Sequence, residues 1–267
     1  MDNRPVGIFD SGLGGLTAAA ALRELLPNEN IIYFADTGRC PYGPRPVPQL
    51  RKMAEQNIKL LTDMGAKAII CACGTMSTNA IDILRSSPVY TANVLDASIS
   101  AMSRVSGNGP LAVIATEAAI KSGVFCSRIQ EAAPDREVIA AACQSFVRLC
   151  ESGHTAPDDP ELVEYTSQCL GEIKNKKPNA LLLGCTHFGI VSEAIRNFLG
   201  DDVELIEASA CGSGTMADYL RQNDMTGTGG QTKIYTSGNA DEFRPLAVKI
   251  FGDKFDIEAE HIPPMEA

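Results

Sequence analysis

The fold follows from the stretch Ala68-Ile69-Ile70-Cys71-Ala72-Cys73-Gly74-Thr75 and from a second stretch of the same design, Ala180-Leu181-Leu182-Leu183-Gly184-Cys185-Thr186-His187. In each stretch four apolar residues are typical of a buried strand, and a cysteine followed by a threonine comes where the strand ends. Ligands of open α/β sheets bind at the carboxyl ends of the strands. The two stretches therefore predict a site with two faces and one thiol, Cys73 or Cys185, on each.

Strand and helix signals alternate along the rest of the chain. Helical spacing of apolar residues covers 16–26 and 49–64, and Leu162, Tyr165, Cys169 and Ile173 mark a further amphipathic face. The expected strands are 6–9, 31–34, 68–71, 89–95, 111–115, 138–141, 180–183, 203–206 and 233–235. This alternation predicts an α/β fold with parallel sheets covered by helices.

The pattern also indicates a coarse internal duplication. Cys73 and Cys185 are separated by about the same distance as the segments 10–12 and 115–118, each of which follows a strand. Two α/β halves that face each other would bring both thiols to one cleft. Ser and Gly become frequent near 96–106, and a Gly-rich loop is expected at 226–231. We therefore expect a first domain of residues 1–97 plus 210–267 and a second of residues 98–209.

Composition favours a globular protein with free thiols. The 267 residues are 45% hydrophobic and 21% charged, so the core can be large enough to need no disulfide or metal. The nine cysteines are an odd number and several lie inside apolar patterns, which fits a reducing compartment better than a disulfide framework. We expect most of them to be small buried residues, such as Cys126, Cys143, Cys169 and Cys211.

Charge and hydropathy exclude several partners. The net charge of −10, with no basic run, opposes binding to nucleic acid or to an anionic membrane. The sequence shows no signal peptide and no apolar stretch of about 18 residues, so we expect a cytoplasmic protein without a membrane span. The spacing of Cys71 and Cys73 has no matching second pair, so we expect no zinc site.

Two loops at the expected sheet edge are candidates for ligand contacts. The first, Asp10 to Gly15, lies between a strand and a helix, where glycines permit close approach and a helix N-terminus offers N–H groups to an anion. Its glycine spacing does not fit a dinucleotide fingerprint. A structural turn, with Asp10 as a helix cap, is the alternative. The second loop, 36–43, follows the next strand, and an ordinary loop is its alternative.

The residues alone leave the roles of four side chains open. Cys73 or Cys185 taken singly could be a buried strand-end cysteine, the commonest environment for this residue. His187 could be a core histidine or a partner that tunes the Cys185 thiol. Glu151 could be an exposed carboxylate at a helix end. The repeated cysteine–threonine pair favours a functional pair of thiols.

Three segments carry a resemblance to a known family. Residues 7–17, 33–43 and 183–187 resemble those of the glutamate racemases, in the aspartate/glutamate racemase superfamily, and the match extends from about Val6 to Met216. The resemblance implies two Rossmann-like parallel-sheet domains related by pseudo-twofold symmetry, with the active site in the cleft between them. It implies cofactor-independent interconversion of L- and D-glutamate by a two-base thiol/thiolate mechanism, which supplies D-glutamate for peptidoglycan.

The resemblance also assigns residues. It implies that Cys73 and Cys185 are the two bases, that Asp10 assists Cys73, and that His187 with Glu151 assists Cys185. It implies no cofactor and no metal, an amino acid as the partner molecule, and an assembly compatible with a homodimer. The substrate site that it implies consists of Asp10, Ser11, Pro41, Tyr42, Gly43, Gly74, Thr75, Thr116, Thr186 and His187.

The chain departs from the family pattern at a few positions. Gly74 stands where the family usually has an Asn that contacts the substrate, and Gln144 and Ser145 replace an apolar pair of the Pro-Leu type. Two alternatives follow: a relative that racemises aspartate or another α-substituted acid, and a binding homologue without catalysis. If glutamate turnover suffers only from the missing amide, Gly74→Asn should raise it.

Overall fold

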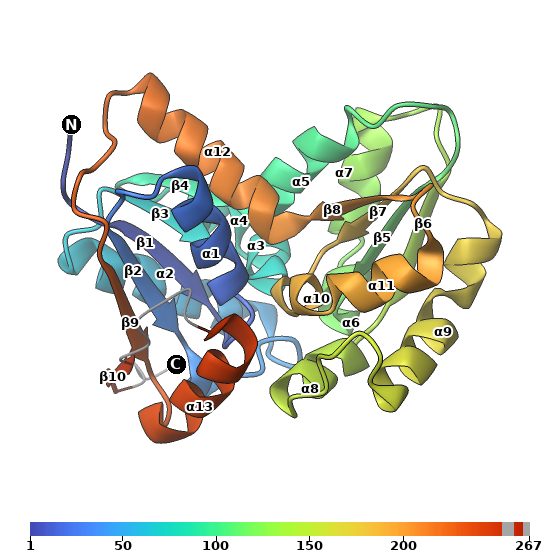
Figure 1. Ribbon diagram of the computed structural model, residues 1–267. Helices are drawn as coiled ribbons and strands as arrows, with labels where there is room; N and C mark the ends of the chain where they lie inside the picture. The colour runs from blue at the N-terminus through green and yellow to red at the C-terminus, as the bar shows by residue number, and fades with distance from the viewer. Residues whose placement is uncertain (253–258, 264–267) are drawn as a thin grey trace.

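The chain folds into two α/β lobes that lie side by side (Figure 1). The computed structural model describes residues 1–252 and 259–263. The first lobe is built on a six-stranded sheet and the second on a four-stranded sheet, and all neighbouring strands in both are parallel. The order in the first sheet is β10 (Ala259–His261), β9 (Thr232–Thr236), β2 (Ile31–Ala35), β1 (Val6–Asp10), β3 (Ala68–Cys71) and β4 (Tyr90–Asn93). The order in the second is β6 (Val138–Ala142), β5 (Leu111–Ala115), β7 (Ala180–Leu183) and β8 (Glu204–Glu207).

Helices connect the strands and cover both sheets, as the alternating pattern predicts. In chain order they are α1 (Leu16–Leu25), the short 3₁₀ helix η1 (Thr37–Arg39), α2 (Val47–Asp63), α3 (Gly74–Asn79), α4 (Ile81–Arg85), α5 (Val94–Met102), α6 (Glu117–Lys121), α7 (Val124–Ala132), α8 (Ser145–Glu151), α9 (Pro160–Asn175), α10 (Thr186–Ile190), α11 (Ser192–Leu199), α12 (Ala208–Gln222) and α13 (Ala240–Phe251).

The two lobes repeat one topology. The order β2-β1-β3-β4 in the first sheet matches the order β6-β5-β7-β8 in the second, so β3 and β7 occupy equivalent places. Cys73 follows β3 and Cys185 follows β7. The first lobe adds β9 and β10 beside β2, so the tail of the chain returns to the first sheet. The predicted fold class, two parallel-sheet lobes with pseudo-twofold symmetry, is confirmed.

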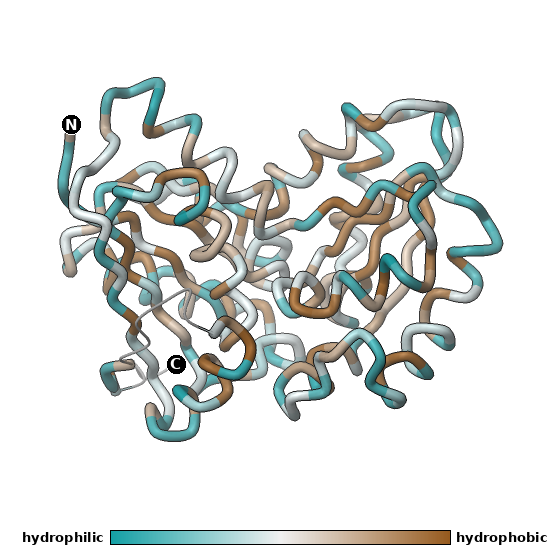
Figure 2. Tube along the Cα trace, in the orientation of Figure 1, coloured by the Kyte–Doolittle hydropathy of each residue, from teal (hydrophilic) through white to brown (hydrophobic). Residues whose placement is uncertain are grey.

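Residues of the inner strands β1, β2, β3, β5 and β7 face alternate sides of their sheets and are buried on both. In β1, Ile8 packs into the apolar cluster under α1 and α12, whereas Phe9 packs into the cluster under α2. Both side chains are inaccessible to solvent. The apolar residues accordingly concentrate on the inner strands, while polar residues dominate the outer loops (Figure 2). This pattern is the one expected when helices cover both faces of a parallel sheet.

One predicted strand is too long. The strand expected at 89–95 ends at Asn93, because the Asn93 side chain accepts a hydrogen bond from the N–H of Asp96 and begins α5. Much of the segment 96–106, expected as a boundary, is therefore helical. The described part of the chain also contains β10, which was not predicted.

The helices α5 and α12 connect the lobes and pack against each other. The expected domain boundaries at 97/98 and 209/210 fall inside these two helices. The division into residues 1–97 plus 210–267 and residues 98–209 therefore stays a prediction. Its segments 253–258 and 264–267 lie outside the described residues.

The expectation that all cysteines are free thiols is wrong for one pair. Cys143, after β6, forms a disulfide with Cys169 of α9, with a Cα–Cα distance of 6.1 Å. Cys143 is buried, but Cys126, Cys169 and Cys211 are only partly so. The sequence pattern missed the pair because the apolar face of α9 carries Cys169 toward the end of β6, a contact that depends on the packing of α9.

None of the helices within residues 1–252 and 259–263 combines the length and apolar character that crossing a membrane requires.

Candidate active site

A small cavity between the lobes brings together both thiols and every predicted substrate-binding residue. The carboxyl ends of β1, β3, β5 and β7 meet around it, as expected for parallel strands. Four further residues line it that the sequence did not single out as site residues, namely Cys40, Gln144, Val147 and Gly184. The remaining lining residues are Asp10, Ser11, Pro41, Tyr42, Gly43, Cys73, Gly74, Thr75, Thr116, Cys185, Thr186 and His187.

Hydrogen bonds join the two lobes across this cavity. The hydroxyls of Thr75, from the first lobe, and Thr116, from the second, lie 3.2 Å apart. The Thr186 hydroxyl donates to Asp10 Oδ2 over 3.2 Å, again from one lobe to the other. The side chains that the sequence placed on separate halves are therefore in direct contact.

Cys185 is paired with a buried histidine. Its Sγ lies 3.9 Å from Nδ1 of His187, and Nε2 of His187 lies 3.3 Å from Glu151 Oε1. The contact with Glu151 is an ion pair rather than a well-aligned hydrogen bond, because Nε2 lacks a hydrogen-bond partner among the described residues. Burial lowers the pKa of His187, but the bond to Cys185 and the contact with Glu151 outweigh it and raise the pKa to about 10. Glu151 itself does not line the cavity and is partly exposed.

Cys73 lies in a different electrostatic environment. Burial, and then the charge of Asp10, raises the pKa of the Cys73 thiol well above its usual range. Asp10 is fully buried, and burial raises its own pKa as well. Its Oδ2 accepts from the N–H of Gly15 and from Thr186, whereas Oδ1 has no partner in the described chain. One N–H expected to serve a bound anion, that of Gly15, is thus engaged by Asp10.

Glycines allow the lobes to approach closely at the thiols. A Cβ atom at Gly74 would lie 2.2 Å from the carbonyl oxygen of Gly184 in the other lobe, and one at Gly14 would lie 2.4 Å from the Thr186 hydroxyl. The variant Gly74→Asn, which should raise glutamate turnover if only the amide is missing, therefore also has to displace the facing lobe. An asparagine side chain at 74 cannot be placed without moving the backbone of the facing lobe.

Sequence reasoning passed over the four additional lining residues for different reasons. Gly184 lies inside the cysteine motif, Cys40 lies inside the loop 36–43, and Gln144 differs from the family pattern without an evident role in the sequence. Burial, and then the charge of Glu151, raises the pKa of Cys40 to about 12. Val147 carried no signal beyond its apolar neighbours. The nearby Arg39 does not line the cavity, because it is buried in an ion pair with Asp36.

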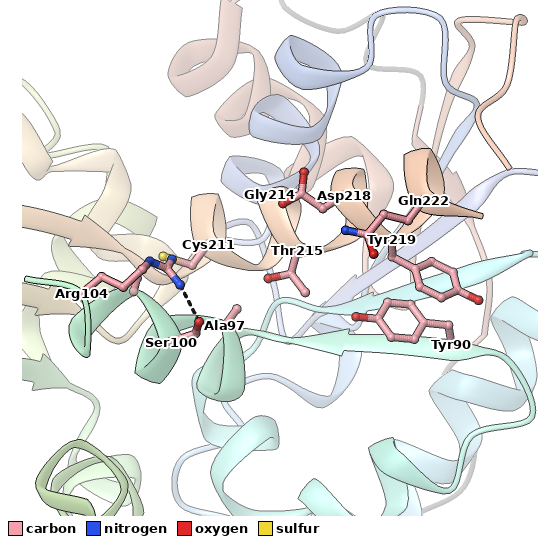
Figure 3. A pocket seen from close by; sticks show the side chains of 11 residues that line it. Tyr90, Ala97, Ser100, Arg104, Cys211, Gly214, Thr215, Asp218, Tyr219 and Gln222 are labelled. Atoms are coloured by element: carbon pink, nitrogen blue, oxygen red, sulfur yellow. Dashed lines mark hydrogen bonds between the residues drawn. The ribbon is translucent and has the colours of Figure 1, made fainter. Parts of the chain in front are cut away.

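A larger cavity, of about 410 Å³, lies elsewhere, between α5 and α12 (Figure 3). Its walls include the stacked rings of Tyr90 and Tyr219 and a hydrogen bond from Arg104 to Ser100. It contains a single thiol, Cys211, so it cannot present one sulfur to each face of a bound molecule. In the described part of the chain, no three His, Cys, Asp or Glu side chains gather into a set that could hold a metal ion.

Comparison with known proteins agrees with this geometry. The family model described as Asp/Glu/Hydantoin racemase matches residues 18–212. The chain belongs to the Asp/Glu/Hydantoin racemase family. Among relatives in this racemase family, a glutamate racemase from Thermoanaerobacter pseudethanolicus is 34% identical over 258 residues, 96% of each chain.

Solved structures in the same racemase family share the whole fold. A glutamate racemase from Francisella tularensis in complex with D-glutamate superposes with a TM-score of 0.87 at 33% identity, over 99% of each chain. The glutamate racemase isoform RacE1 from Bacillus anthracis superposes with a TM-score of 0.91 at 25% identity, over 100% of each chain.

Proposed function

We propose that this protein is a cofactor-independent glutamate racemase that interconverts L- and D-glutamate with Cys73 and Cys185 as its two bases. One observation carries the proposal: equivalent strands of two lobes, β3 and β7, deliver one thiol each to the same cavity. The relatives named above are glutamate racemases, and the match covers nearly the whole length of each chain. This supports glutamate as the substrate.

The two thiols need different protonation states, and their surroundings supply them. The raised pKa of His187 keeps a positive charge beside Cys185 at neutral pH, whereas burial and then the charge of Asp10 raise the pKa of Cys73. We therefore assign the thiolate of the resting enzyme to Cys185 and the thiol to Cys73. The Cys185 thiolate removes the Cα proton from one face and becomes a thiol. The Cys73 thiol then donates its proton to the opposite face and becomes a thiolate. No electrons are exchanged with another reagent, and the reverse reaction starts from the opposite pair of states.

Through Asp10, the ammonium group of the substrate can influence the protonation of Cys73. The unpartnered Oδ1 of Asp10 is a suitable acceptor for the substrate ammonium group. Burial and then the carboxylate charge of Asp10 raise the pKa of Cys73, and the positive charge of the ammonium group offsets the second of these, which favours the Cys73 thiolate once the substrate is bound. The ammonium group also makes the Cα proton more acidic. Glu151 acts through His187, which it holds from the side opposite to Cys185.

Among the described residues no lysine or arginine lines the cavity, and His187 is engaged by Cys185 and Glu151, so we assign the substrate carboxylates to neutral donors. We assign this role to the hydroxyls of Ser11, Thr75, Thr116 and Thr186 and to the backbone N–H groups of Tyr42, Gly43 and Gly74, whereas Pro41, which has no N–H, contributes to the wall of the cavity. The reaction would supply D-glutamate for peptidoglycan. We place it in the cytoplasm and propose that the enzyme can form a homodimer.

The test is direct racemisation. Incubation with L-glutamate and chiral separation should yield D-glutamate, and Cys73→Ala and Cys185→Ala should each lower turnover by at least about 10³-fold, since each removes a base. Cys126→Ala is the matched control, because Cys126 is a free thiol outside the cavity, and it should leave turnover unchanged. Turnover of aspartate but not of glutamate would overturn the substrate, and retained activity in either base variant would overturn the two-base mechanism.

A further inference from the structure

The substrate cavity contains one side-chain amide, and it belongs to a residue in which this chain departs from the family pattern. Gln144 lines the cavity together with hydroxyl-bearing residues, and no lysine or arginine accompanies it. Among the described residues, it is the one lining side chain besides His187 that has a nitrogen donor. The imidazolium of His187 is engaged by Cys185 and Glu151, so a dicarboxylic ligand here relies on such neutral donors for its remaining contacts.

The orientation of the Gln144 amide is fixed by a backbone group. Its Oε1 accepts a hydrogen bond of 3.2 Å from the N–H of Glu117, the first residue of α6. Because a backbone N–H can only donate, the atom facing it must be the amide oxygen. Nε2 therefore faces away, and the described residues provide no acceptor for it.

Hydrogen bonds fix the backbone of the residues before and after Gln144. Ligand binding therefore costs little conformational entropy at this position. The N–H of Cys143 donates to Ala115 O over 2.9 Å, and the N–H of Ser145 donates to the Tyr165 hydroxyl over 3.2 Å. The disulfide to Cys169 anchors the same turn to α9. A donor held in this way is preorganised for its ligand.

The sheet order shows which part of the substrate Gln144 can reach. Cys185 follows β7, Thr116 follows β5 and Gln144 follows β6, and these strands are neighbours in the order β6-β5-β7. Adjacent strands are about 4.8 Å apart, so Gln144 starts roughly 10 Å along the sheet edge from the thiol that faces Cα. The ammonium and carboxylate groups on Cα of the substrate would then lie near Cys185 and Asp10. The side chain of the substrate, if it extends along the sheet edge past Thr116, would reach Gln144.

We propose that Gln144 determines substrate specificity by donating a hydrogen bond from Nε2 to the side-chain carboxylate of the amino acid. This inference rests on the proposed function. Gln144 thereby supplies an amide donor from the second lobe, in a cavity where Gly74 of the first lobe cannot carry one, since a side chain there would collide with Gly184.

The experiment compares two variants that separate donation from structure. Gln144→Leu removes both the donor and the acceptor that engages Glu117. Gln144→Glu keeps that acceptor but replaces the donor with a negative oxygen. We expect KM for glutamate to rise about tenfold in Gln144→Leu and further in Gln144→Glu, with kcat within about threefold of the wild type. Gln168→Leu, at an exposed glutamine of α9 whose amide donates to Glu164, is the matched control and should change neither constant.

The second measurement identifies the substrate group that is bound. Exchange of the Cα proton in heavy water is followed for L-glutamate and for L-glutamine, whose side chain ends in an amide. In Gln144→Glu the ratio of glutamine to glutamate kcat/KM should rise at least tenfold. The assignment to the side-chain carboxylate is overturned if this ratio does not rise. That outcome includes an equal fall of kcat/KM for both substrates and the absence of any exchange with glutamine. Wild-type-like KM values in Gln144→Glu overturn the donor role, whereas a wild type inactive on glutamate overturns the proposed function instead.

Discussion

His187 keeps its proton although its side chain is almost fully buried, which is unusual for an imidazole. Its contacts with Cys185 and Glu151 are what raise its pKa to about 10. We predict that His187→Gln lowers kcat by roughly 10²-fold, because the Cys185 thiolate loses its positive partner. Thiolate absorbance near 240 nm should fall in parallel. His154→Gln, which alters a histidine paired with Asp159 outside the cavity, is the control. Unchanged kcat in His187→Gln would refute this role.

The same histidine sets a pH dependence with a definite sign. Because its pKa is raised, the imidazolium is fully present at neutral pH and is lost only as the pH rises through about 10. The wild-type kcat/KM should therefore decline on the alkaline side near that pH. The decline assigned to His187 should be missing from the profile of His187→Gln.

At position 74, the close approach of the facing lobe leaves no room for a side chain. We predict that Gly74→Ala lowers kcat/KM at least tenfold, because its Cβ would lie 2.2 Å from Gly184 O and prevent the lobes from closing fully. Gly171→Ala in α9 is the control: nothing lies within 4 Å of a Cβ there, and alanine should stabilise the helix by about 0.5–1 kcal/mol. Circular dichroism should show both variants folded. Full activity in Gly74→Ala would mean that this closed contact is not required.

At the scale of the elements, the Cys143–Cys169 disulfide joins the turn after β6 to α9. Thiol titration of the denatured chain without reductant should find seven free thiols, the number left by the Cys143–Cys169 disulfide. We predict that Cys169→Ser lowers the free energy of unfolding by roughly 3 kcal/mol, as expected for closing a loop of this length. Urea denaturation measures it, and reductant should bring the wild type to the same value. A wild type insensitive to reductant would contradict the prediction.

Helices and strands could be predicted from the sequence where neighbouring residues alone determine them. The strands around Cys73 and Cys185 are runs of buried apolar residues, so their position and the residues at their ends followed from the sequence. The end of β4 depended on one capping bond at Asn93, and β10 is a three-residue strand with two exposed positions. The Gly74–Gly184 contact and the place of Gln144 depend on the facing lobe, which no local pattern encodes.

For the whole molecule, the relation between the lobes governs substrate access. The cavity measures about 30 Å³, room for roughly two water molecules, so we predict that the lobes separate to admit glutamate. Gly43 and Ala118 face each other across the cleft, and a Cβ at Gly43 would lie 3.9 Å from that of Ala118. This distance is within the range of about 3.5–4.5 Å found in disulfides.

A covalent lock across the cleft tests this requirement. We predict that the double variant Gly43→Cys and Ala118→Cys loses at least 90% of its racemase activity on oxidation, in proportion to the cross-link formed. Reductant should restore activity, because the lobes can open again. Each single variant, oxidised in the same way, is the control. A fully cross-linked enzyme that still turns over glutamate would show that the lobes need not open.

The central claim is that sulfur atoms from opposite lobes act on opposite faces of one carbon atom. The most direct measurement is racemisation of L-glutamate in heavy water, with isotope content determined separately for each enantiomer early in the reaction. We predict that the D-glutamate formed carries one solvent deuterium at Cα, while the remaining L-glutamate carries none, because the thiol that returns the hydrogen is not the one that removed it. Deuterium appearing equally in both enantiomers, or product that retains its original hydrogen, would contradict the two-base account.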